Sequence, residues 1–187
     1  MDDMKSKFEL ILDKDEEIKE VFKPNKLKLY VRSLLWSTLS LLFFCGIAIL
    51  SILFPDTDEF VEPLWVLLPV GIFVVFEALN VLFIALYYKN VFYAYTNKRV
   101  IIRTGIFGVD FKSLDMSMIG AIDVDVSLLD KILRKNTGSI RFGSTSSPMS
   151  GQGSVFMFAN IANPYESYKI IKSFIDEYKT KKSESEK

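Results

Sequence analysis

Two apolar stretches decide the fold of this chain: SLLWSTLSLLFFCGIAILSILF at residues 33–54 and LWVLLPVGIFVVFEALNVLFIALYY at residues 64–88. The first contains no charged side chain, and the second contains one, Glu77. As helices rising 1.5 Å per residue they would be about 33 and about 37 Å long, enough to cross a hydrocarbon layer of ~30 Å. Neither shows the polar stripe that a helix on the surface of a soluble protein needs. The sequence therefore predicts a two-helix transmembrane hairpin, with helices at residues 30–54 and 64–88.

The charges beside these stretches predict their orientation. The connecting segment, PDTDEFVEP at residues 55–63, contains acids but no lysine or arginine. Basic residues lie beyond the other ends of the two stretches, namely Lys23, Lys26, Lys28, Arg32, Lys89, Lys98, Arg99 and Arg103. Lysine and arginine that flank membrane spans stay on the cytoplasmic side. We therefore expect a multi-pass protein of the cell membrane, with an external loop at residues 55–63 and both termini in the cytoplasm.

The composition excludes several classes of function. The 187 residues include no histidine and a single cysteine, Cys45, inside the first apolar stretch. This excludes disulfide frameworks, Cys/His zinc sites and catalytic triads that contain histidine. The formal net charge is zero, and the basic residues form no single block that nucleic acid would need. We expect no catalytic, metal or cofactor site, no nucleic-acid partner and no enzymatic activity.

After residue 89 the sequence changes to the pattern of a mainly β domain. Asn97 and Lys98 separate two strand-like runs as a hairpin turn in which asparagine tolerates positive φ. Asp123 and Asp125 alternate with apolar residues, which is typical of a strand with one solvated face rather than of a cation site. Further expected elements are strands at 91–96, 99–104, 109–114, 122–126, 139–142 and 155–159, a short helix at 128–133 and a Gly/Ser-rich loop at 143–154.

A final helix closes the predicted domain. Asn163 and Pro164, with Glu166, form a helix start in which the asparagine caps, the proline takes the first helical position and the glutamate caps in return. Apolar residues then follow helical spacing as far as position 178. We expect a cytoplasmic domain at residues 89–178, followed by a charged, disordered tail at 179–187.

Three segments resemble the YdbS-like bacterial pleckstrin-homology (PH) family, a domain of unknown function: YTNKRVIIRTGIFG at 95–108, MSMIGAIDVDVSLLDKILRKNTGSIRF at 116–142 and FMFANIANPYESYKIIKSF at 156–174. The positions that carry the resemblance are Thr96, Arg99, Gly105, Ile122, Leu128, Thr137, Gly138 and Pro164.

The segment LDKDEEIKEVFKP at residues 12–24 is also similar to the start of family members. The resemblance implies that residues 17–23, within an N-terminal segment at 1–29, form the first strand of the domain. It also implies a PH-like fold with about seven strands, a partly open barrel and a C-terminal capping helix.

Two groups of side chains are candidates for a site. Lys98, Arg99 and Arg103 could contact anionic lipid head groups, although topology signals and solvated strand ends explain the same charges. Glu77 and Asn80 lie on one face near the middle of the second apolar stretch. In an antiparallel hairpin the polar residues at matching depth are Ser37, Thr38 and Ser40. These residues predict a polar seam inside the membrane, as interhelical hydrogen bonds or as a protonatable site.

The predicted function is a membrane-anchored, cytoplasmic PH-like binding or scaffolding module. Its ligand would be a protein, a second copy of itself or anionic lipid, and the sequence does not separate these. We expect membrane lipid as a partner, together with a protein partner or a homo-oligomer, and no cofactor. The alternative is an accessory subunit of a membrane transport or export system whose activity lies in the transmembrane hairpin.

Overall fold

The computed structural model describes residues 2–53, 63–132, 136–145 and 156–185. The expected external loop therefore falls outside the described residues except for Pro63, as does most of the Gly/Ser-rich loop. The chain divides into two compact units, one formed by Met1–Lys26 with Tyr87–Lys187 and the other by Leu27–Leu86. The first unit begins with α1 (Asp2–Lys5) and the 3-10 helix η1 (Ser6–Ile11).

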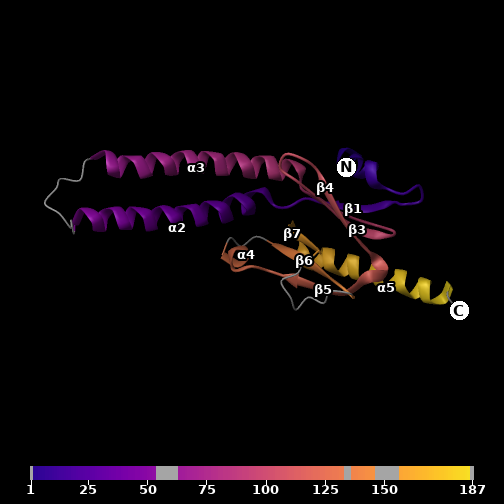
Figure 1. Ribbon diagram of the computed structural model, residues 1–187. Coiled ribbons are helices and arrows are strands. Elements are labelled where there is room, and N and C mark those ends of the chain that lie inside the picture. The colour runs from indigo at the N-terminus through magenta and orange to yellow at the C-terminus, as the bar shows by residue number, and fades with distance from the viewer. Residues whose placement is uncertain (1, 54–62, 133–135, 146–155, 186–187) are drawn as a thin grey trace. The chain divides into compact units, whose positions relative to one another are not determined.

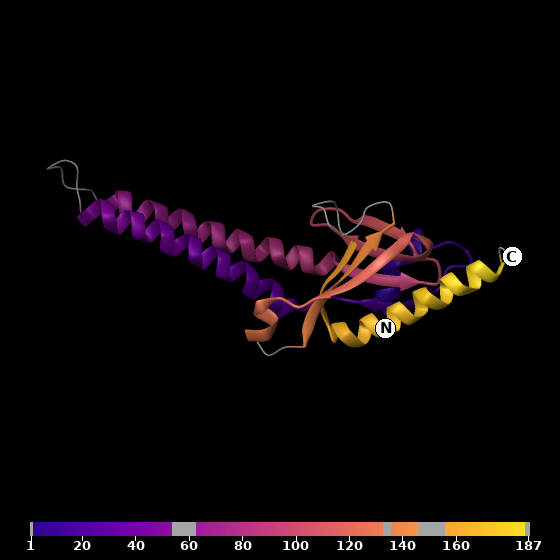
Figure 2. The same cartoon turned by 90° about the horizontal axis from the view of Figure 1, so that it is seen from below.

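Two long helices form the apolar unit, α2 (Lys26–Leu53) and α3 (Pro63–Asn90). They run side by side in both views of the molecule (Figure 1, Figure 2). By length and composition, Lys26–Ile47 and Val70–Asn90 could each cross a membrane. Their large apolar side chains point outward, and Leu42 and Phe76, for example, are 65% and 64% exposed. Both helices form where the sequence predicts them.

The first sheet contains four antiparallel strands: β1 (Ile18–Phe22), β2 (Phe92–Thr96), β3 (Arg99–Thr104) and β4 (Asp110–Asp115). The strand order is β1-β2-β3-β4, with Val21 opposite Ala94. The strand that precedes α2 therefore pairs with the strand that follows α3. Two chain segments separated by both long helices belong to one sheet.

The hairpin turn between β2 and β3 differs from the expected one. The non-glycine residues with positive φ in the described ranges are Asn160 and Asn163, so Asn97 does not adopt the left-handed conformation. Asn97 uses its side chain instead, donating from Nδ2 to the Asp15 carbonyl at 2.9 Å and accepting from the Glu17 N–H at 2.9 Å. The turn is thus held by the segment that leads into β1.

The second sheet has the order β5-β6-β7, with β5 (Ile119–Asp125), β6 (Thr137–Ser144) and β7 (Phe156–Ala162), all antiparallel. The 3-10 helix η2 (Met116–Met118) leads into β5, and α4 (Leu128–Ile132) connects β5 to β6. The seven strands that the resemblance implied are confirmed. In Figure 1, β5 lies at one margin of this sheet.

The core lies between the sheets and the last helix, α5 (Pro164–Ser185). Phe158 is fully buried and stacks on Tyr93, with ring centroids 5.1 Å apart, while Phe142 meets it edge-on at 4.9 Å. Ile171 and Ile175 from α5 are also buried in this core. Figure 2 shows α5 lying along the strands. The C-terminal capping helix is therefore confirmed.

The disordered tail expected at 179–187 is wrong for the described part of that range, because α5 continues to Ser185. Its last turns consist mostly of lysine, glutamate and serine, and the first two are good helix formers. Lys181 lies 2.6 Å from Glu177, one turn earlier, and such a pair adds slightly to the stability of an exposed helix. Helix propensity thus extends α5 beyond the part that packs on the core.

Candidate functional site

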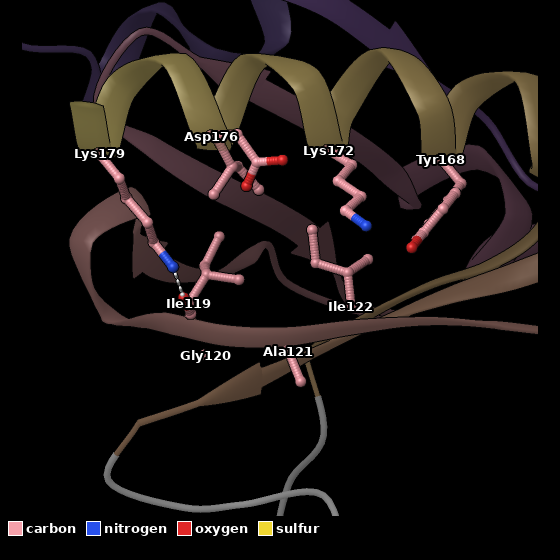
Figure 3. Close-up of a pocket in the computed structure, with 9 residues that line it drawn as sticks. Ile119, Gly120, Ala121, Ile122, Tyr168, Lys172, Asp176 and Lys179 are labelled. Carbon is pink, nitrogen blue, oxygen red and sulfur yellow. Dashed lines mark hydrogen bonds between the residues drawn. The ribbon is translucent and has the colours of Figure 1, made fainter. Parts of the chain in front are cut away.

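A groove of about 190 Å³ lies between β5 and α5. It is lined by Ile119, Gly120, Ala121, Ile122, Tyr168, Lys172, Ile175, Asp176 and Lys179. In Figure 3, Tyr168 and Lys172 extend from α5 toward β5, and Ile122 points back toward the helix. The volume is below the ~300 Å³ at which pockets for drug-sized ligands begin. The groove therefore suits a side chain or a short stretch of polypeptide better than a whole cofactor.

One wall of the groove is the edge of a sheet. Within the described residues, β5 pairs with β6 alone, so its other side keeps backbone groups that no strand uses. Lys179 donates from Nζ to the Ile119 carbonyl at 2.6 Å, which shows that this carbonyl faces the groove (Figure 3). Unpaired edges are where a protein adds an extended segment as a further strand.

The charges of the groove come from one face of α5. Lys172, Asp176 and Lys179 follow helical spacing and line the same side of the groove. Asp125 of β5 is directed elsewhere, since it bonds Arg141 on β6. No group of three metal-ligating side chains occurs in the part of the chain that the structure describes. The groove is therefore a polypeptide-sized site with more basic than acidic side chains.

A second feature, which we call the N-terminal clamp, consists of Glu16, Thr96 and Arg99. The Glu16 side chain is fully buried. Arg99 donates from Nε and Nη2 to its two carboxylate oxygens at 2.9 and 2.8 Å, and Thr96 donates to Oε1 at 2.7 Å. A bidentate guanidinium–carboxylate pair fixes orientation as well as charge. The clamp holds the segment before β1 on the β2–β3 hairpin.

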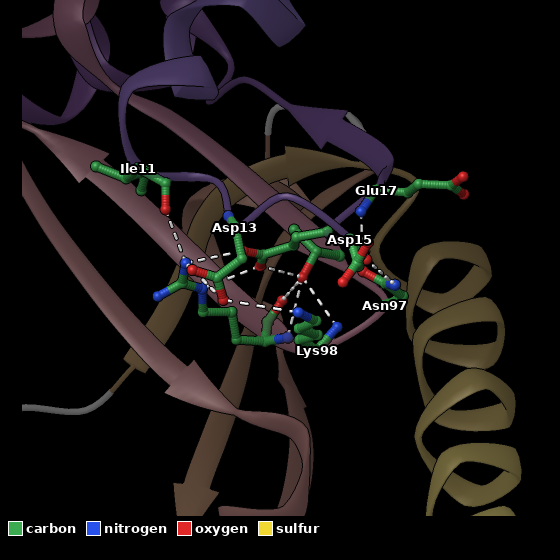
Figure 4. Close-up of polar contacts among 9 residues, drawn as sticks. Ile11, Asp13, Asp15, Glu17, Asn97 and Lys98 are labelled. Carbon is green, nitrogen blue, oxygen red and sulfur yellow. Dashed lines mark hydrogen bonds and ion pairs between the residues drawn. The ribbon is translucent and has the colours of Figure 1, made fainter.

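Further contacts surround the N-terminal clamp (Figure 4). Arg99 also donates to the Ile11 carbonyl at 2.8 Å, and the Asp13 N–H donates to Glu16 at 3.1 Å. Burial raises the pKa of Glu16, but the hydrogen bonds from Arg99 and Thr96 outweigh it and hold that pKa below its ordinary value. Glu16 is therefore a carboxylate at neutral pH, and Arg99 is engaged inside the protein.

The structure does not bring Lys98, Arg99 and Arg103 together. Lys98 and Arg99 lie at the β2–β3 turn, whereas Arg103 lies opposite Phe92 at the other end of β3. At ~3.3 Å per residue, Arg99 and Arg103 are separated by about 13 Å along the strand. Of these three residues, only Arg103 lies beside the C-terminal end of α3.

Arg103 belongs instead to a basic–aromatic cluster, which we define as Lys23, Lys26, Tyr88, Phe92 and Arg103. The Lys23 ammonium lies 4.3 Å from the centroid of the Tyr88 ring and 4.5 Å from that of Phe92, and the Arg103 guanidinium lies 5.5 Å from that of Phe92. These are cation–π distances. Burial lowers the pKa of Lys23 from its ordinary value. The cluster gathers positive charge at the end of α3.

Several residues of the predicted polar seam between α2 and α3 have contacts in the structure. Ser33 donates to Asn80 Oδ1 at 2.9 Å and joins α2 to α3. Ser37 is buried but donates to a carbonyl of its own helix, and Ser40 is exposed. Glu77 Oε1 is buried and has no hydrogen-bond partner among the described residues. Asn80 thus bonds Ser33, which lies one helical turn before the expected Ser37. The seam at Glu77 stays a prediction.

Sequence reasoning missed the groove and the acidic half of the N-terminal clamp. The signal for the groove was present in α5, where Tyr168, Lys172, Asp176 and Lys179 form one polar stripe beside the buried face. The edge that faces this stripe is not visible in the sequence, because strand order depends on distant pairings.

Comparison with known proteins agrees with the fold. The model of the family described as Bacterial PH domain matches residues 41–174, more than two thirds of the chain. No curated protein and no solved structure matches the chain. The match begins within α2 and includes all strands from β2 to β7 and the first half of α5. This chain belongs to the bacterial PH domain family.

Proposed function

We propose that this chain is a membrane-anchored binding module whose PH-like domain holds an extended segment of a partner protein between β5 and α5. The observation that supports the proposal is the edge of β5 that no strand among the described residues pairs with, beside a groove lined by a helix. Membership in the bacterial PH domain family supports a binding or scaffolding role rather than catalysis. Fold alone does not specify a ligand, so the proposal depends on the groove.

The bound segment would lie as an added strand along β5. One of its N–H groups would donate to the Ile119 carbonyl in place of Lys179, which would free the ammonium for a carboxylate. Lys172 and Lys179 are about 10 Å apart along the axis of α5, a distance that an extended chain covers in about three residues. Because side chains of a strand alternate between its two faces, the preferred partner segment carries two acidic side chains at an even spacing, two or four residues apart.

The proposed anchor is the pair of apolar helices, with spans at 30–54 and 64–88, an external loop at 55–63 and the domain and both termini in the cytoplasm. The exposed apolar side chains of α2 and α3 support this, because a soluble protein rarely exposes so large an apolar surface. The YdbS-like branch of the family remains the resemblance that we propose for the chain.

The groove can be tested with the full chain in nanodiscs and peptides that carry two glutamates at different spacings. We expect binding to favour a spacing of two or four residues over one of three, because only even spacings place both glutamates on one face of the strand, and to slow amide hydrogen exchange in β5. Lys172→Glu should weaken binding by about tenfold, since each tenfold corresponds to about 1.4 kcal/mol. The matched control is Lys169→Glu, on α5 but outside the groove, which should leave affinity unchanged.

Binding without slower exchange in β5, or no peptide binding at any spacing, would overturn the proposed site. Self-association of the chain that Lys172→Glu abolishes would also overturn it, because a second copy would then occupy the groove.

A second candidate is an accessory subunit of a transport or export system with its activity in the hairpin. The observation that favours it is the buried Glu77 Oε1 within an apolar helix, which has no hydrogen-bond partner in the described part of the chain. Ionisable residues at such positions are expensive and often functional.

A further inference from the structure

The connection between β3 and β4 exposes apolar side chains in a row. Residues 105–109 read GIFGV, and Ile106, Phe107 and Val109 are 38%, 87% and 43% exposed. Single exposed apolar residues are common on protein surfaces, but three within five positions form a patch. We call residues 105–109 the apolar loop.

The apolar loop has a defined shape. Gly105 has φ +136°, and a Cβ at this position would lie 2.0 Å from the Gly108 carbonyl oxygen. Asn90 donates from its side-chain amide to the carbonyls of Gly105 and Ile106, at 3.2 and 3.4 Å. The loop is therefore tightly turned and tied to the helix end, which restrains the surface that it presents.

The position of Asn90 locates the loop relative to the apolar stretch. Asn90 is the last residue of α3, two positions after Tyr88, where the apolar stretch ends. At 1.5 Å per residue, Asn90 lies about 3 Å beyond that point along the helix axis. If α3 spans the bilayer, as the proposed function requires, the loop carbonyls that Asn90 binds are at the membrane boundary.

Positive charge lies at the same end of the domain. Arg103 precedes the apolar loop by two positions and donates to the Asn90 carbonyl at 3.2 Å. It belongs to the basic–aromatic cluster with Lys23, whose ammonium contacts the rings of Tyr88 and Phe92. Apolar side chains flanked by cations and aromatic rings match the bilayer interface, where acyl chains meet anionic head groups.

We infer that the apolar loop enters the cytoplasmic leaflet, with Phe107 deepest, while Lys23 and Arg103 contact the phosphates of anionic lipids. The loop thereby forms a third membrane contact besides the two helices and restricts how the domain turns relative to the bilayer. This inference rests on the membrane anchorage of the proposed function but not on the ligand of the β5–α5 groove. The alternative is that a protein surface covers the apolar loop, and the experiment must distinguish this from contact with lipid.

The test is spin-label depth measurement on the full chain in nanodiscs of phosphatidylcholine with phosphatidylglycerol. In a Cys45→Ser background, labels are placed by Phe107→Cys, by Lys98→Cys at the far end of β3 and by Leu79→Cys within α3. We expect the labels at 107 and 79 to be accessible to oxygen and protected from a water-soluble nickel chelate. The label at 98 should show the opposite accessibility.

The controls distinguish failure of the lipid contact from failure of the membrane anchor. Nickel access at 107 with protection at 79 would overturn the lipid contact and leave the anchor intact, whereas nickel access at 79 would overturn the anchor itself. Protection at 107 that appears only at a high ratio of protein to lipid would identify a protein contact and overturn the inference. The label at 107 should lie deeper in membranes with phosphatidylglycerol than in pure phosphatidylcholine, and Lys23→Gln should reduce this difference. An unchanged difference would remove Lys23 from the site, and no difference in the original chain would remove anionic lipid from it.

Discussion

At the residue scale, Glu16 links two segments that are far apart in sequence. It bonds Arg99 across 83 positions, inside the domain. Glu16→Gln keeps the side-chain size but leaves the guanidinium without its buried countercharge. We expect a loss of about 3 kcal/mol, the lower part of the range for breaking a buried pair, because Arg99 is partly exposed. Thermal unfolding in detergent would measure it, with exposed Glu177→Gln as the matched control.

The same pair predicts a dependence on pH. Because the pKa of folded Glu16 lies below its ordinary value of 4.5, its contribution to stability is present above pH 4.5 and is lost as pH falls through the folded pKa. The difference between wild type and Glu16→Gln should therefore be constant near neutral pH and shrink in acid. A difference that stays constant into acid would show that Glu16 does not act through its charge.

In the apolar unit, the role of Glu77 can be tested with two substitutions. As interhelical hydrogen bonding is typically worth ~0.6 to 2 kcal/mol, Glu77→Gln should leave folding and function nearly intact, whereas Glu77→Leu should weaken the hairpin by about that amount. Thermal stability and membrane insertion of both variants are the measurements. Loss of function in Glu77→Gln with unchanged stability would instead indicate a protonatable site and favour the transport alternative.

At the scale of elements, the β3–β4 connection depends on one glycine. Gly105→Ala would place a methyl group against a backbone oxygen at positive φ, which should cost about 1–3 kcal/mol. Gly108→Ala, three positions on, would meet nothing within 4 Å and is the matched control. Unfolding midpoints of the two variants should differ accordingly. Equal midpoints would mean that the loop is less tightly turned than its geometry indicates.

At the scale of the whole molecule, the orientation of the chain in the membrane can be tested directly. The excess of lysine and arginine on one side predicts that a cysteine at Thr57 reacts with an impermeant thiol reagent in intact cells, while one at Ser183 does not. Replacing Cys45 by serine removes the native thiol in both strains, and permeabilised cells show that the cysteine at 183 is reactive. The reverse labelling pattern would contradict the proposed topology.

Local patterns were sufficient for most elements of this protein. Two apolar runs of more than 20 residues, with Glu77 as their one charged residue, indicate helices long enough for a bilayer. Asn163 and Pro164 predict the start of α5, and the strand-like runs around Asn97 predict the first hairpin. Each pattern depends on neighbours within a few positions, so it can be interpreted without knowing the rest of the fold. The resemblance to PH domains added the first strand and the count of seven.

Pairings between distant segments could not be predicted in the same way. Arg99 is a candidate lipid contact by sequence, but Glu16 binds its guanidinium inside the domain. Of the three candidates, Arg103 lies beside the end of α3, where it donates to the Asn90 carbonyl. The groove exists because β5 ends a sheet and α5 packs alongside it. Strand order and cross-sheet contacts depend on the free energy of burying the whole core, which no short window of residues specifies.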